Sequence, residues 1–172
     1  MGNHAVKYGL YYGAASIVVS LLFWLAMPDM IFNIGISFAV SIIVPLIFMF
    51  LAIRDTKNEQ EGFISFGECL KASFLTYIIG SLIGVIFSFV LMNYLDPSLL
   101  DLQKEAAIEA AESMSSMLGA PEEAMEEMRE QMEEQDLDTF TVGQAMIGWL
   151  GGLVFPGLIL ALIMSGVLKK NM

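Results

Sequence analysis

Four long runs of apolar residues, none containing a charged side chain, alternate with short polar segments and one long acidic segment. The runs cover residues 8–27, 31–53, 72–95 and 144–168. About 20 residues in a helix, each rising about 1.5 Å, reach across a hydrocarbon layer about 30 Å thick. The pattern therefore predicts an all-α integral membrane protein, a four-helix bundle whose spans are these four runs.

Local sequence signals mark both ends of the third run. Ser65 is followed three residues later by Glu68, the capping-box pattern in which each side chain accepts a hydrogen bond from a backbone N–H of the other residue. At the far end, Asp96 precedes Pro97, and a residue before proline disfavours the helical conformation. The sequence therefore predicts a helix that starts after Ser65 and ends at Asp96.

Small residues and prolines indicate how the spans pack. Glycines four residues apart let two helices approach closely, and we expect helix packing at Gly9, Gly13, Gly80, Gly84, Gly148 and Gly152. Pro45 and Pro156 lie inside the second and fourth spans, where each removes a backbone donor that a neighbouring helix must compensate.

The acidic segment, residues 96–141, contains 14 of the 19 acidic residues of the chain. Its apolar positions recur at spacings of three and four, which predicts an amphipathic helix over about 98–118. Gly119 ends that helix, and Pro121 starts a second one with methionines along one side. We expect an amphipathic helical hairpin between the third and fourth spans; whether 98–136 is ordered without a partner is left open, because the segment is rich in Glu.

Basic residues predict the orientation in the membrane. Four spans put both termini on the same side as the middle segment, where we expect Arg54 to Gln60 to form a short solvated loop. That side carries six of the eight basic residues, and short basic loops stay in the cytoplasm. We therefore expect a multi-pass protein of a bacterial inner (plasma) membrane with both termini cytoplasmic and 96–141 extracytoplasmic.

Composition excludes several classes of protein. Apolar residues make up 56% of the chain and the mean hydropathy is +0.68, too apolar for a soluble domain of this size. Cys69 is the only cysteine and His4 the only histidine, so one chain forms neither a disulfide nor a His/Cys metal cage. The net charge of −11 disfavours nucleic acid as a partner. We expect no catalytic residues, no cofactor and no metal site.

A set of short motifs resembles a known bacterial membrane family, the domain of unknown function 4199. The similar positions are Arg54, Asp55, Gly62, Phe63, Ser65, Phe66, Gly67, Lys71, Asp96 and Pro97. The resemblance covers nearly the whole chain. It implies a small multi-pass inner-membrane protein and brings no catalytic residues with it.

Three functions are consistent with these patterns. The first is a non-enzymatic structural or interaction protein that displays the acidic hairpin to an envelope protein, with the lipid bilayer as its other partner. The second is a small transporter or channel subunit, which Pro45 and Pro156 favour and the lack of ionisable residues inside the spans disfavours. The third is a metal-binding protein that uses the thioethers of Met114, Met117, Met125, Met128 and Met132. A homo-oligomer is compatible with each.

Overall fold

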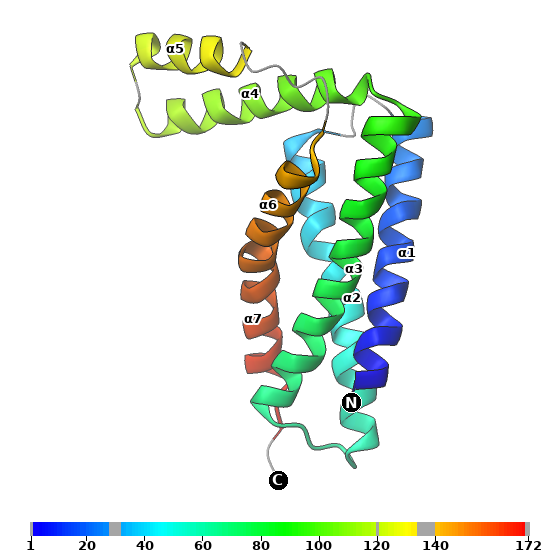
Figure 1. The fold of residues 1–172 in the computed structure, drawn as a ribbon. Coiled ribbons are helices and arrows are strands. Elements are labelled where there is room, and N and C mark those ends of the chain that lie inside the picture. Colours follow the sequence, from blue (N-terminus) through cyan, green and yellow to red (C-terminus); the bar gives the residue numbers. More distant parts are fainter. Residues whose placement is uncertain (1, 28–31, 120, 134–139, 171–172) are drawn as a thin grey trace.

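The computed structural model describes residues 2–27, 32–119, 121–133 and 140–170. Four upright helical segments form a bundle, and two further helices lie across one end of it (Figure 1). Both termini lie at the opposite end. We call these the hairpin end and the termini end. Parts of the acidic segment, residue 120 and residues 134–139, lie outside the described residues.

The four upright segments are all long and apolar enough to span a membrane, which confirms the all-helical prediction with four spans. The first two are α1 (Gly2–Ala26) and α2 (Ile34–Glu59). The third is α3 (Phe66–Val90), which the π-helical η2 (Leu91–Leu95) continues. The fourth consists of α6 (Val142–Gly152), the π-helical η3 (Leu153–Leu158) and α7 (Ile159–Leu168). The described residues contain no β-strand, only an isolated bridge between Ile64 and Lys170.

The start of α3 has the predicted capping box. The Ser65 hydroxyl accepts a hydrogen bond from the Glu68 N–H at 3.3 Å, and the Glu68 carboxylate accepts one from the Ser65 N–H at 2.9 Å. The preceding turn contains Gly62 at φ +91°, a left-handed conformation that glycine adopts without steric cost. The chain can therefore reverse within a few residues between α2 and α3.

The end of α2 differs from the expectation. Residues 54–59, expected to be part of a solvated loop, continue the helix, and only residue 60 onward forms the turn. Thr56 is fully buried and its hydroxyl donates to the Ala52 carbonyl at 2.8 Å. Asp55 also has a partner on α1, described below. The helix extends past its apolar run because Asp55 and Lys57 bond to other helices and Thr56 is buried, whereas the side chains of Arg54, Asn58 and Glu59 are exposed.

The closest helix contact is that between α1 and α3. A Cβ atom added at Gly80 would lie 1.9 Å from Cδ1 of the Tyr12 ring. Added at Gly9 or Gly13, it would lie within 2.7 Å of an isoleucine side chain of α3. The two helices therefore approach to a separation that only a missing side chain permits, as the glycine spacing in α1 and α3 suggests.

The remaining candidate glycines make looser contacts. At Gly84 an added Cβ would meet Ser16 at 3.6 Å, and at Gly152 it would meet the Tyr77 hydroxyl at 3.9 Å, both ordinary contact distances. At Gly148 no described atom lies within 4 Å of it, so the close packing expected there is absent between the described helices of this chain. The adjacent Trp149 donates from Nε1 to the Ser81 hydroxyl at 3.0 Å, which turns Gly148 away from α3.

The fourth span is interrupted near its middle. Phe155 has φ −134° and ψ 116°, a non-helical conformation, and Pro156 follows it inside η3. An added Cβ at Gly157 would lie 2.5 Å from the Tyr77 ring, so the break packs directly against α3. Tyr77 also belongs to the apolar core of the bundle, with Tyr12, Met49, Leu160 and Ala161.

We predict that Gly80→Ala destabilises the bundle by about 1–3 kcal/mol, the usual cost of an overpacked site, because its Cβ has no room beside Tyr12. The matched control is Gly148→Ala, whose Cβ enters open space. Equilibrium unfolding in detergent micelles checks both. Equal stability of the two variants would contradict the close α1–α3 contact.

Candidate functional site

Polar side chains gather at the two ends of the bundle, and each end is a candidate site. At the hairpin end, α4 (Leu99–Met117) and α5 (Glu122–Glu133) form an antiparallel pair that lies across the bundle (Figure 1). At the termini end, α1 and α2 bring together charged and hydroxyl side chains. The hairpin carries most of the acidic charge, and the termini end carries most of the family-motif residues.

The hairpin is held at its two ends by side-chain hydrogen bonds, one made by Asn93 of the third span and one by Trp24 of α1. The Asn93 amide donates from Nδ2 to the Phe140 carbonyl at 2.9 Å, and the Phe140 N–H donates back to Asn93 Oδ1 at 3.1 Å. Three residues further on, Asp96 accepts a hydrogen bond from Trp24 Nε1 at 2.8 Å. The segment therefore leaves and re-enters the bundle at neighbouring points, both held by side-chain hydrogen bonds.

Asp96 is held in its ionised form. The Ser98 hydroxyl and the Trp24 indole N–H donate to its carboxylate and lower the pKa of Asp96 below its ordinary value of 3.8. Pro97 and Ser98 form the turn that follows, and Leu99 and Leu100 are buried directly after it. The carboxylate thus fixes the corner between the third span and α4.

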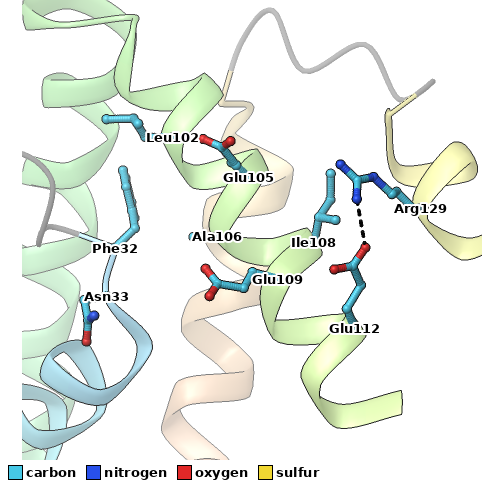
Figure 2. Close-up of a pocket in the computed structure, with 9 residues that line it drawn as sticks. All are labelled: Phe32, Asn33, Leu102, Glu105, Ala106, Ile108, Glu109, Glu112 and Arg129. Atoms are coloured by element: carbon cyan, nitrogen blue, oxygen red, sulfur yellow. Dashed lines mark hydrogen bonds and ion pairs between the residues drawn. The ribbon is translucent and has the colours of Figure 1, made fainter. Parts of the chain in front are cut away.

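A groove of about 380 Å³ lies beneath the hairpin, open to solvent (Figure 2). Carboxylates from α4 and one arginine from α5 face it, beside apolar side chains and the residues that begin α2. Its lining consists of Phe32, Asn33, Leu102, Glu105, Ala106, Ile108, Glu109, Glu112 and Arg129. The predominance of carboxylates makes the groove a negatively charged surface.

Polar contacts between α4 and α5 include an ion pair and a hydroxyl–sulfur contact. Arg129 Nη1 lies 3.4 Å from Glu112 Oε1, an exposed ion pair that adds little stability. The Ser115 hydroxyl donates to the sulfur of Met128 at 4.0 Å. Met128 is half-buried between the helices, as expected of a flexible apolar side chain that fills such a seam.

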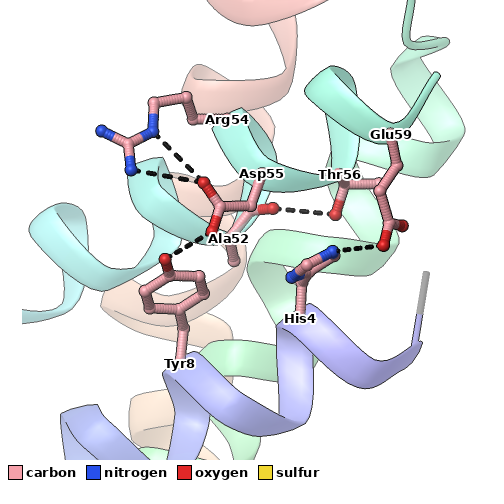
Figure 3. Close-up of polar contacts among 7 residues, drawn as sticks. All are labelled: His4, Tyr8, Ala52, Arg54, Asp55, Thr56 and Glu59. Atoms are coloured by element: carbon pink, nitrogen blue, oxygen red, sulfur yellow. Dashed lines mark hydrogen bonds and ion pairs between the residues drawn. The ribbon is translucent and has the colours of Figure 1, made fainter. Parts of the chain in front are cut away.

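At the termini end, Asp55 is the centre of a small network (Figure 3). The Tyr8 hydroxyl donates to Asp55 Oδ2 at 2.6 Å, and Arg54 lies 3.3 Å from Oδ1. One turn away, His4 Nε2 lies 2.7 Å from Glu59 Oε1. Two side chains of α1 therefore bind two carboxylates of α2, and the pairing of Arg54 with Asp55 is only one part of this network.

The loop that carries the Gly62–Gly67 motif binds the end of the chain. Ile64 and Lys170 exchange two backbone hydrogen bonds of 2.9 Å. The Lys170 ammonium lies 5.5 Å from the Phe63 ring and that of Lys169 lies 6.0 Å from the Phe66 ring, both within the range of a cation–π contact. Gly67 and Lys71 are exposed on the first turns of α3. The motif thus closes the termini end rather than forming a cavity.

No cluster of three or more His, Cys, Asp or Glu side chains able to hold a metal ion occurs in the part of the chain that the structure describes. Sequence reasoning missed the partners Tyr8–Asp55, His4–Glu59 and Trp24–Asp96. The spacing of Asp55 and Glu59, one turn apart at the end of a span, was the available signal, because it places both carboxylates on the same helix face.

The sequence from residue 7 to residue 170 matches the family model described as protein of unknown function DUF4199. The chain belongs to the DUF4199 family. Neither a curated protein nor a solved structure matches it. The match covers all four spans and the hairpin, so the DUF4199 unit includes both ends described above, and the family description carries no activity to either.

We predict that Tyr8→Phe lowers the free energy of unfolding by about 1 kcal/mol, since it removes one hydrogen bond to a partly exposed carboxylate. Tyr11→Phe is the control, because the Tyr11 ring is exposed and its hydroxyl makes no hydrogen bond to a described residue. Unfolding of both variants in the same detergent tests the pair. If both variants match the wild type, the contact contributes nothing.

We also predict a pH dependence at Asp96. Because folding lowers the pKa of Asp96, its stabilisation is fully present above the ordinary value near 4 and is lost as the pH falls through the folded-state pKa. Asp96→Asn should therefore remove part of the acid-induced loss of stability. Unfolding midpoints between pH 6 and about 3, in wild type and variant, measure this. Parallel curves would contradict the prediction.

Proposed function

We propose that this DUF4199 protein is a non-enzymatic structural or interaction protein of a bacterial plasma membrane, and that it displays the acidic α4–α5 hairpin outside the cytoplasm to an envelope protein. Both termini would then be cytoplasmic. The distribution of basic residues supports this orientation, since six of the eight lie at or near the termini end.

The observation that carries the proposal is the exposed acidic surface of the hairpin. Glu123, Glu126, Glu127 and Glu130 of α5 are all exposed. The hairpin packs on the bundle chiefly at its base, where Leu99 and Leu100 are buried. Such a surface favours a partner with a basic face, which it would attract by charge complementarity.

The interior of the bundle agrees with a structural role. Tyr12, Met49, Tyr77, Leu160 and Ala161 pack together at its centre, and partly buried apolar side chains from α2 and α3 surround them. The four buried serine and threonine residues of the described spans each donate to a backbone carbonyl of their own helix; they are Thr56, Ser73, Thr76 and Ser165. These hydroxyls are thereby satisfied without a solute.

A second candidate is a small transporter or channel subunit. The break at Phe155 supports it, because interrupted helices occur at the binding sites of many transporters. We rank it second because the break is covered by the Tyr77 ring and adjoins the apolar core.

We predict that a photocrosslinking residue at position 127, in living cells, captures an envelope protein with an extracytoplasmic basic surface. The control residue is at Asn58, exposed at the other end of the bundle. Replacing Glu123, Glu126, Glu127 and Glu130 by Gln should reduce capture from an adjacent position such as Gln131, and so should high salt, which screens exposed charges.

Capture of cytoplasmic proteins from position 127 would overturn the orientation. Capture that is unchanged by the Gln substitutions and by salt would overturn the charge-based recognition.

A further inference from the structure

Helix α4 is longer than its contact with the bundle. Its first residues, Leu99 and Leu100, are buried against the last turn of the third span, whereas its far half projects sideways beyond α6 (Figure 1). At the projecting end the exposed fraction is 60% for Met114, 85% for Met117 and 81% for Leu118. Three large apolar side chains therefore lie uncovered at the tip.

The helical geometry shows which way this end faces. Ser115 contacts Met128, so that side of α4 faces α5. Ala106, about 180° around the helix from Ser115, lies in the groove with Phe32 at the end of the bundle. Met117 follows Ala106 by eleven residues, about three turns, and so lies on the same face. The side of α4 that covers the bundle at its base therefore continues, uncovered, to the tip.

The packing of the first residues of α4 determines the depth of this helix relative to the membrane. Leu99 and Leu100 pack on Leu91 and Met92, in the last turn of the third span, with Trp24 and Phe140 beside them. Tryptophan and other aromatic side chains commonly mark the boundary between lipid and water. Because α4 runs across the bundle from this point, its axis lies at the membrane surface, and α5 lies on the side away from the bundle (Figure 1).

We propose that the projecting half of α4 lies in the interfacial layer of the same bilayer that the bundle spans, with Met114, Met117 and Leu118 immersed among the lipids. The uncovered face continues the exposed apolar surface of the fourth span below it, where Val142 and Ile147 are 63% and 73% exposed. A helix with one apolar face and one charged face binds in this position.

Charge selects the kind of lipid. Glu105, Glu109 and Glu112 flank the apolar face, so anionic headgroups are repelled and zwitterionic ones are accepted.

Contact with the bilayer also determines where α5 points. When the tip of α4 lies in the membrane surface, the exposed carboxylates of α5 face away from the membrane, as the proposed function requires. The lipid contact itself does not depend on which side of the membrane the hairpin occupies.

The test places a polarity-sensitive fluorophore on a cysteine at one of three positions, Met117→Cys, Met114→Cys or Glu127→Cys. Cys69 is fully buried, and the wild-type chain reports any background labelling. Each protein is reconstituted at one chain per nanodisc in phosphatidylcholine, with and without lipid that carries a nitroxide quencher near its headgroup. We expect at least about twofold quenching at 117 and 114, the two exposed methionines proposed to lie among the lipids, and little at 127.

Aqueous iodide should give the opposite order, with position 127 the most accessible. Equal quenching by nitroxide lipid at all three positions, or quenching at 117 only with two chains per disc, would overturn the proposal; the latter result would show that a second copy covers the face. Because a nanodisc exposes both membrane surfaces, this result is independent of the orientation tested by crosslinking.

Discussion

The close contact between α1 and α3 is the constraint on which the bundle depends. In a bilayer, burial of apolar side chains gives little driving force between helices, so packing distance and polar contacts decide which helices associate. The Tyr12 ring lies over Gly80 where no side chain could fit, and α1 glycines receive isoleucine side chains of α3. α2 and α7 then pack around this pair. The remaining contacts are less extensive, and polar bonds at the ends supplement them.

The hydrogen bonds at the two ends of the bundle have different structural roles. At the termini end, Tyr8 and His4 bind carboxylates of α2, while Ile64 and Lys170 join the loop before α3 to the end of the chain. At the hairpin end, Asn93 of the third span holds Phe140, and Trp24 of α1 holds Asp96. The first arrangement ties helices to one another, and the second holds an appendage.

The spans, their order and the Ser65 cap could be predicted from the sequence because each is recorded locally, in uncharged runs or in residues three positions apart. The extension of α2 through Glu59 could not, because it depends on partners 47 or more residues away in the chain, as with Tyr8 and Asp55. Glycine spacing indicated close packing at Gly9, Gly13 and Gly80 but not which helices meet there, and at Gly148 no described part of this chain lies close, since spacing does not reveal which side of a helix faces its neighbour. The two helices of the hairpin could be predicted from the sequence. The charged groove could not, because its lining comes from α4, α5 and the start of α2, which only the fold brings together.

The break in the fourth span has a consequence for how that span is rotated about its own axis. Pro156 has no N–H, so the carbonyl of Gly152 lacks its usual α-helical donor, and backbone that departs from α-helical bonding is tolerated at membrane depth only where protein covers it. The interrupted side must therefore be turned inward, where the Tyr77 ring covers Gly157. With the fourth span rotated in this way, Gly148 and Gly151 lie on the opposite side and border the lipid acyl chains. They form a smooth strip of helix surface that has almost no side chains.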